Sequence, residues 1–305
     1  ILSALSNFQN KANIMPEATP LHLLLNGMVA HNQDRIDEAS LIIRNYVAGA
    51  GIINQCVPNR LSRCFLHFES CSRAREEEGL VYQLLSFDSS VASVTSCKDG
   101  SFPLHYASLL GNTRIFQMVH SIRPEAARAP NRKGKLPLHL AAREGHLNIV
   151  RFLLQMYPQA AAIPTFKLKL PLHFSAAEGH VEISRLLLST FPMGARHMST
   201  KGKLPLHLAS RQGRVELARL LLHFYPEGTK GLDWEGSLPL HEATLRNQEK
   251  MVELLMDVYP AGLETCNIRG EIPLFAAVRS NNTPLVHAML MIYPEGGKRA
   301  LQSLN

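Results

Sequence analysis

The chain has 305 residues and a net charge of +7, from 32 Lys and Arg against 25 Asp and Glu. With 46% apolar and 19% charged residues, the composition excludes a disordered tail and a coiled coil. No apolar run approaches the ~20 residues that a membrane-spanning helix needs. The five cysteines, few and odd in number, favour reduced thiols and therefore an intracellular protein of the cytoplasm or nucleus. Because residue 1 is Ile, a preceding segment that targets an organelle stays an open alternative.

Residues 1–100 are predicted to form atypical helical repeats with insertions. A Thr-Pro-Leu-His motif stands at residues 19–22, and a degraded copy, Cys-Phe-Leu-His, stands at residues 64–67. The distances between these copies and the next one place the insertions around residues 44–60 and 86–96. We therefore expect irregular repeat units in this part of the chain.

Residues 101–305 are predicted to form six regular repeats of 34 residues. Each unit opens with Pro-Leu, followed by His in five of the six, and closes with an aromatic-Pro or related pair. Proline suits the first position of a helix, and a second helix with a stripe of apolar residues ends before the closing proline. Each unit is thus two short helices and a turn. The opening prolines are Pro103, Pro137, Pro171, Pro205, Pro239 and Pro273. In the unit that begins at Pro137, the apolar stripe is Ile149, Val150, Leu153 and Leu154.

The segment from Leu136 to His146 resembles the ankyrin repeat, whose motif is T-P-L-H-x-A-A-x-x-G-H. It departs from the family in having Leu136 for the threonine, and the period is 34 residues where the family has 33. The resemblance implies an all-α solenoid of stacked helix–turn–helix units with short turn fingers. Eight repeats are recognisable. The last is expected to be a terminal cap, because Phe275 and Asn281 replace the usual His and Gly.

The histidines are interpreted as structural. Seven of the 14 occupy the motif position, where the ankyrin resemblance implies hydrogen bonds within and between units. Neighbouring motif histidines should lie roughly 8–10 Å apart, too far to share a zinc ion. The one Cys/His cluster lacks a Cys-x-x-Cys pair, and no catalytic or phosphate-binding motif occurs. We therefore expect no enzyme, no cofactor, no metal and no small-molecule substrate. The cluster comprises Cys56, Cys64, His67 and Cys71.

The net charge is concentrated in the turns before the prolines. Counted over six residues each, the three central turns sum to +7, the charge of the whole chain. A partner with an acidic face would be steered by such a patch; the alternative is that Lys is simply a well-solvated turn residue. The basic residues of these turns are Arg132, Lys133, Lys135, Lys167, Lys169, Lys201 and Lys203. Arg143 and Arg211 extend the patch onto the first helices.

The turn tips include three large apolar residues. Phe166, Trp234 and Ile268 stand at the same position of their turns, where we expect exposure to solvent. Exposed aromatic groups beside charge are typical of binding hot spots. The alternative is that each tip packs on its neighbour.

Together these features predict a non-catalytic scaffold that binds one or more proteins through a groove and the turn tips. Two alternatives remain open. One is a subunit of an RNA or ribonucleoprotein complex, or another polyanion binder, that uses the basic turns. The other is the targeting region of a larger multidomain enzyme.

Overall fold

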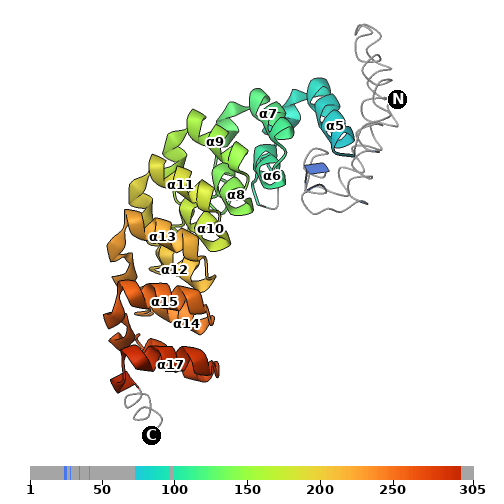
Figure 1. Ribbon diagram of the computed structural model, residues 1–305. Coiled ribbons are helices and arrows are strands. Elements are labelled where there is room, and N and C mark those ends of the chain that lie inside the picture. Colours follow the sequence, from blue (N-terminus) through green and yellow to red (C-terminus); the bar gives the residue numbers. More distant parts are fainter. Residues whose placement is uncertain are drawn as a thin grey trace, which may run out of the picture. The chain divides into compact units, whose positions relative to one another are not determined.

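The computed structural model describes residues 73–96 and 99–296, together with a few isolated positions before residue 42. Within these residues there are thirteen α-helices, six 3-10 helices and no strand (Figure 1). The expected all-α repeat fold is thus confirmed. The motifs at residues 19–22 and 64–67, the insertion around 44–60 and the Cys/His cluster lie outside the described residues.

The first helix of each regular repeat begins at the repeated proline, as predicted. Proline has no backbone N–H and a fixed φ, and neither property destabilises a helix when proline stands at its first position. After each first helix the chain reverses at a residue with positive φ. That residue is a glycine in four repeats, such as Gly179 at +92°, and Asn247 and Asn281 in the last two. The first helices are α6 (Pro103–Leu110), α8 (Pro137–Glu144), α10 (Pro171–Glu178), α12 (Pro205–Arg211), α14 (Pro239–Leu245) and α16 (Pro273–Arg279).

The second helix of each repeat buries the predicted apolar stripe. In α9, Ile149 and Leu153 are fully buried, with Val150 and Leu154 beside them. Most second helices have 10 residues, whereas α5 has 15. The second helices are α5 (Arg73–Phe87), α7 (Thr113–Ile122), α9 (Leu147–Met156), α11 (Val181–Thr190), α13 (Val215–Phe224), α15 (Glu249–Val258) and α17 (Thr283–Ile292).

A 3-10 helix follows most second helices, a feature that the sequence pattern did not predict. The closing proline ends the α-helix and also opens this tighter turn, whose first position tolerates proline. Tyr157 leaves the helical conformation at φ −146°, and Pro158 then starts η3, in which Ala160 and Ala161 are buried. The 3-10 helices are η1 (Ser89–Ser93), η2 (Pro124–Ala127), η3 (Pro158–Ala162), η4 (Pro192–Arg196), η5 (Pro226–Lys230) and η6 (Pro260–Glu264).

The chain divides into two compact units, residues 1–137 and 138–305. In the first unit, α7 packs against α5 and α6. In the second unit, the first helices α10, α12, α14 and α16 pack in one row, and the second helices α9, α11, α13 and α15 pack in another (Figure 1). Each first helix also packs on the second helix of its own repeat. The apolar core of the second unit lies between these two rows, as stacking of repeats requires.

The motif histidine joins its helix to the turn that opens the next repeat. The Nδ1 atom of His207 accepts the backbone N–H of Leu204 at 3.1 Å, and its Nε2 donates to the carbonyl of Ser237 at 3.0 Å. His105, His173 and His241 make the same pair of bonds, each to a carbonyl 30 residues later. Burial, with a smaller contribution from neighbouring His197, lowers the pKa of His173 to about 3. The structural role expected for these four histidines is confirmed.

Candidate interaction surface

From Pro137 on, the six residues before each opening proline form a short turn, called a finger below, and the side chain of its first residue closes it by hydrogen bonds to the backbone. In the finger 233–238, the Asp233 carboxylate accepts the backbone N–H groups of Glu235 and Ser237 at 2.9 and 2.8 Å. Gly236 supplies the left-handed residue at φ +69°. Asn131 and Asn267 close their fingers in the same way. The finger backbone is therefore fixed by local bonds.

In the second unit, each pair of neighbouring fingers is joined by one backbone hydrogen bond. The N–H of Thr200 donates to the carbonyl of Lys167 at 3.0 Å, and that of Trp234 donates to Lys201 at 3.1 Å. The N–H of Ile268 donates to Glu235 at 3.0 Å. These bonds align the tips of the second unit in a single row, so side chains at equivalent positions face the same side.

The three apolar tips are exposed on this row. Phe166 is 71% exposed, Trp234 65% and Ile268 73%. Trp234 also contacts the preceding finger, because its indole Nε1 donates to the carbonyl of Thr200 at 2.9 Å. Its ring is thus held in place while most of its surface faces solvent. Such a preorganised aromatic group loses little side-chain entropy when a partner covers it.

Basic side chains gather on the two fingers around Phe166. Lys167 and Lys201 are exposed, and Lys169 is half-buried. The ammonium of Lys169 lies 5.7 Å from the ring centroid of Phe174. Burial lowers the pKa of Lys169, and the nearby positive charges, Lys167 first among them, lower it further. The fingers therefore form a region of concentrated positive charge.

Lys203 is on the same finger as Lys201, but its ammonium belongs to a largely buried ion-pair cluster. Its side chain is 14% exposed, its ammonium is paired with Glu242, and the Asp233 carboxylate lies 3.5 Å away. The Nε atom of Arg211 lies 3.9 Å from the same Glu242. The charge of Lys203 is therefore balanced by two buried carboxylates, and it contributes less to the surface than the sequence count of +7 suggests.

The remaining predicted residues are distributed over both units. Arg132 and Lys133 are exposed on a finger of the first unit, whereas Lys135 is half-buried and its carbonyl accepts the His105 bond. Arg143 is exposed at the end of α8, in the second unit, with its Nε atom 3.4 Å from the carboxylate of Glu144. Arg132, Lys133 and Lys135 therefore belong to the first unit, and Arg143 belongs to the second.

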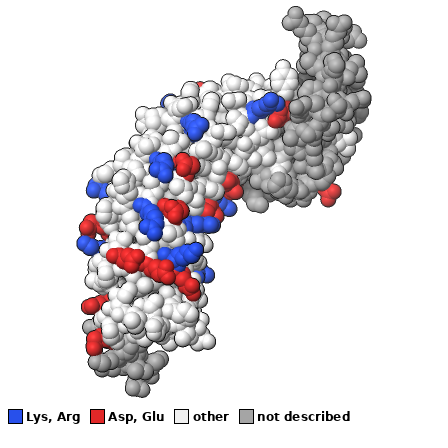
Figure 2. Space-filling model, in the orientation of Figure 1, with Lys and Arg blue, Asp and Glu red and all other residues white. Residues whose placement is uncertain are grey.

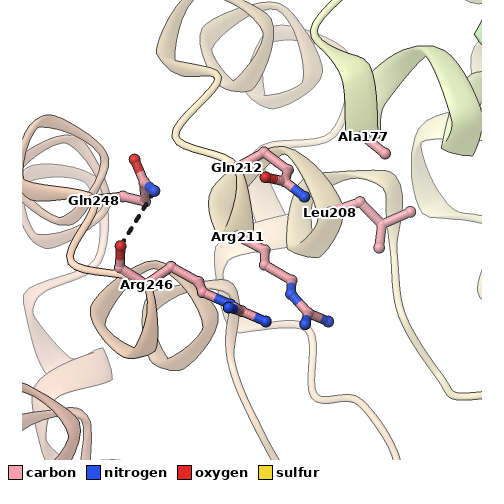
Figure 3. Close-up of a pocket in the computed structure, with 6 residues that line it drawn as sticks. All are labelled: Ala177, Leu208, Arg211, Gln212, Arg246 and Gln248. Atoms are coloured by element: carbon pink, nitrogen blue, oxygen red, sulfur yellow. Dashed lines mark hydrogen bonds between the residues drawn. The ribbon is translucent and has the colours of Figure 1, made fainter.

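A hollow of about 430 Å³ lies at the C-terminal ends of the first helices of the second unit. Figure 3 shows the guanidinium groups of Arg211 and Arg246 directed to the same side of it. Arg211 was predicted from the sequence to be a binding residue, and Arg246 was not. A comparison of residues at 34-residue intervals would have found it, since Glu144, Glu178, Gln212 and Arg246 form one column of changing charge. The other residues lining the hollow are Ala177, Leu208, Gln212 and Gln248.

The surface charge is mixed. Figure 2 shows acidic side chains interspersed among the basic ones on the face in view. No group of three or more His, Cys, Asp or Glu residues suited to a metal ion occurs among the described residues. In the same part of the chain, every helix is too short or too polar to cross a membrane.

Comparison with known proteins gives the family. The family model described as ankyrin repeats (3 copies) matches residues 70–165 and 161–230. These spans together cover more than half of the 305 residues, and they include helices of both units. No curated protein sequence matches the chain. The matched spans, the prolines that open the helices and the histidines that bridge the repeats agree, and the chain therefore belongs to the ankyrin-repeat family.

Proposed function

We propose that this chain is a non-catalytic scaffold that binds a protein partner across the fingers of its second unit. Ankyrin repeats are generally protein–protein interaction modules, and the finer assignment rests on one observation. Phe166, Trp234 and Ile268 are exposed large apolar groups in one row, on fingers whose backbones are already fixed. Because Trp234 is 65% exposed, covering it removes roughly 100–160 Å² from water, worth about 2.5–4 kcal/mol at ~25 cal/mol per Å² before the costs of association.

The charge beside the tips suggests the character of the partner. Lys167 and Lys201, on the two neighbouring fingers, are exposed, while burial and, after it, the repulsion of nearby positive charges lower the pKa of Lys169. An acidic surface on the partner would relieve this repulsion and would be steered to the fingers before contact. The partner is therefore proposed to combine an apolar patch with acidic residues.

A polyanion such as RNA is the second candidate, and the same lysines favour it. Against it, acidic side chains are interspersed with the basic ones (Figure 2), and Lys203 is already paired with Glu242. The finger of Trp234 itself carries Asp233 and Glu235. Nucleic-acid grooves instead follow the phosphate backbone with continuous positive charge.

Affinity capture from a native extract tests the proposal. The bait is the whole chain, compared with Trp234→Ala, Phe166→Ser and a Lys133/Lys167/Lys201→Glu triple variant, with and without nuclease. A discrete protein that survives nuclease and is lost with the tip variants supports the proposal. Recovery that collapses with nuclease contradicts it and favours the polyanion.

A matched control separates a specific tip from general stickiness. Met156 is a large apolar residue, 58% exposed, at the end of α9 and away from the fingers. Met156→Ala removes a comparable apolar surface, so it should leave capture unchanged. Equal loss of the partner with Met156→Ala and with Trp234→Ala would count against a finger site.

A further inference from the structure

Two hollows of opposite charge lie at the ends of the first helices of the second unit. The larger, shown in Figure 3, contains Arg211 and Arg246 and no carboxylate in its lining. The smaller, about 280 Å³, is lined by Glu144 and Glu178 with Arg143 and His180. Counting side-chain charges with His neutral, the first hollow carries two positive charges and the second one negative charge. The charge at the C-terminal ends of the first helices therefore changes from negative to positive along the second unit.

The side chains around both hollows are partly fixed by the fold. The Nε2 atom of His180 hydrogen-bonds to the carbonyl of Arg143 at 2.8 Å, and the Arg143 guanidinium lies 3.4 Å from Glu144. The amide of Gln248 donates to the carbonyl of Arg246 at 3.2 Å. Within the described residues, Arg246 has no ion pair, and the contact of Arg211 with Glu242 is long, at 3.9 Å. The two arginines can therefore accept a carboxylate from outside.

We infer that these hollows bind an extended segment of a partner protein in one direction. An acidic side chain enters between Arg211 and Arg246, and a basic side chain lies against Glu144 and Glu178. This inference rests on the proposed function and adds a second contact region to the fingers. A free anion would occupy one hollow alone, and a nucleic acid would be repelled by the two glutamates. The charge pair of a protein segment fits both.

The geometry sets the spacing of that charge pair. Arg246 stands two repeats after Glu178, and neighbouring packed helices lie roughly 8–10 Å apart. The two hollows are therefore separated by about 16–20 Å. An extended chain advances at most ~3.3–3.6 Å per residue. The acidic and basic residues of the partner segment are thus expected about five or six positions apart.

The test uses a displayed library of random 16-residue peptides, selected on the whole chain. We expect enrichment of peptides with an acidic and a basic residue about five or six positions apart. A synthetic peptide from this set should bind about tenfold more weakly or worse to Arg211→Glu/Arg246→Glu. Changing its acidic residue to Lys should restore binding to that variant. The Glu144→Lys/Glu178→Lys variant should show the reciprocal behaviour with the basic residue changed to Glu.

The controls separate this inference from the proposed function. The variants change exposed or half-exposed side chains, so their circular dichroism should match the wild type. Because Arg211→Glu places a second carboxylate near Glu242, Arg246→Glu alone repeats the binding test, and its melting temperature should match the wild type. Peptides or captured partners that depend on Trp234 but bind both charge variants equally would overturn the inference and leave the finger proposal standing. A chain that enriches no peptide and captures no protein would contradict both.

Discussion

Acidification should destabilise the second unit, because its buried histidines resist protonation. For His173 the expected loss of folding free energy can be calculated. Its ring accepts the N–H of Leu170 at 3.1 Å and donates to the carbonyl of Lys203 at 3.3 Å. A second proton would remove the acceptor and place a buried charge near His197 and Lys169. Burial, first, and His197, second, therefore lower the pKa of His173 to about 3.

The sign and size of the change in folding stability with pH follow from the linkage between protonation and folding. In the unfolded chain a histidine titrates near 6.5, so between pH 6.5 and about 3 the unfolded state binds a proton that the folded state does not. The contribution of His173 to stability is complete above pH 6.5 and is lost as the pH falls. At pH 5.0, about 1.5 units below the unfolded pKa, the loss is about 2 kcal/mol at ~1.4 kcal/mol per unit. His207 and His241, whose pKa values are also lowered by burial, act in the same direction.

Urea unfolding at pH 7.5 and pH 5.0 measures this effect. In His173→Gln an amide can still donate and accept hydrogen bonds but does not titrate, so the variant should lose about 2 kcal/mol less than the wild type between the two pH values. His223 is exposed, and His223→Gln serves as the matched control for the replacement of one imidazole by an amide. An equal loss in the wild type and in His173→Gln would refute the linkage of this histidine to folding.

Three further substitutions test the packing of the fingers, each by the urea midpoint. Leu168 has φ +50° where the other fingers have glycine. Leu168→Gly should therefore stabilise the protein by about 0.5–1 kcal/mol, because the relief of backbone strain exceeds the entropy that glycine loses on folding. A lower urea midpoint would contradict the strain at this residue. Gly202→Ala should destabilise by about 2 kcal/mol or more, because φ is +71° and the new Cβ would lie 2.7 Å from the backbone N of Trp234; an unchanged midpoint would show that the fingers are loosely joined. Glu242→Ala should destabilise by about 1–3 kcal/mol, because Lys203 is left with the Asp233 carboxylate alone, and Glu242→Gln, which keeps a hydrogen-bond acceptor for the ammonium, should destabilise less. Equal urea midpoints for the two variants would show that the cost does not come from the lost contact with Lys203.

Much of the fold could be predicted because the repeat makes each local signal appear several times. The position of Pro137 predicted the start of α8, and the stripe from Ile149 to Leu154 predicted the buried face of α9. The 3-10 helix after Tyr157 was missed, because a proline that ends one helix and a proline that opens a tighter turn look the same in sequence.

The charge of the candidate surface was harder to predict, because a basic residue of one repeat can pair with an acidic residue of the next. Lys203 was counted as a surface cation, yet its partner Glu242 is 39 residues later, where the preceding repeats have Leu140, Phe174 and Leu208. The fate of Trp234 could not be decided from sequence either. It is exposed and also bonded to the preceding finger, so both interpretations of the tip hold in part.

Four motif histidines bond to a carbonyl 30 residues later, and this has a consequence for where such an array can be cut. A structurally complete repeat does not end where the 34-residue sequence period ends. The imidazole of His241 bonds to the carbonyl of Glu271, which lies in the finger that opens the following repeat. A shortened chain that stops after α15 would leave the Nε2 atom of His241 without this acceptor, whereas one that extends through residue 272 would keep the bond. Shorter versions of this protein should therefore end just after a finger, one step beyond the boundary that the sequence period suggests.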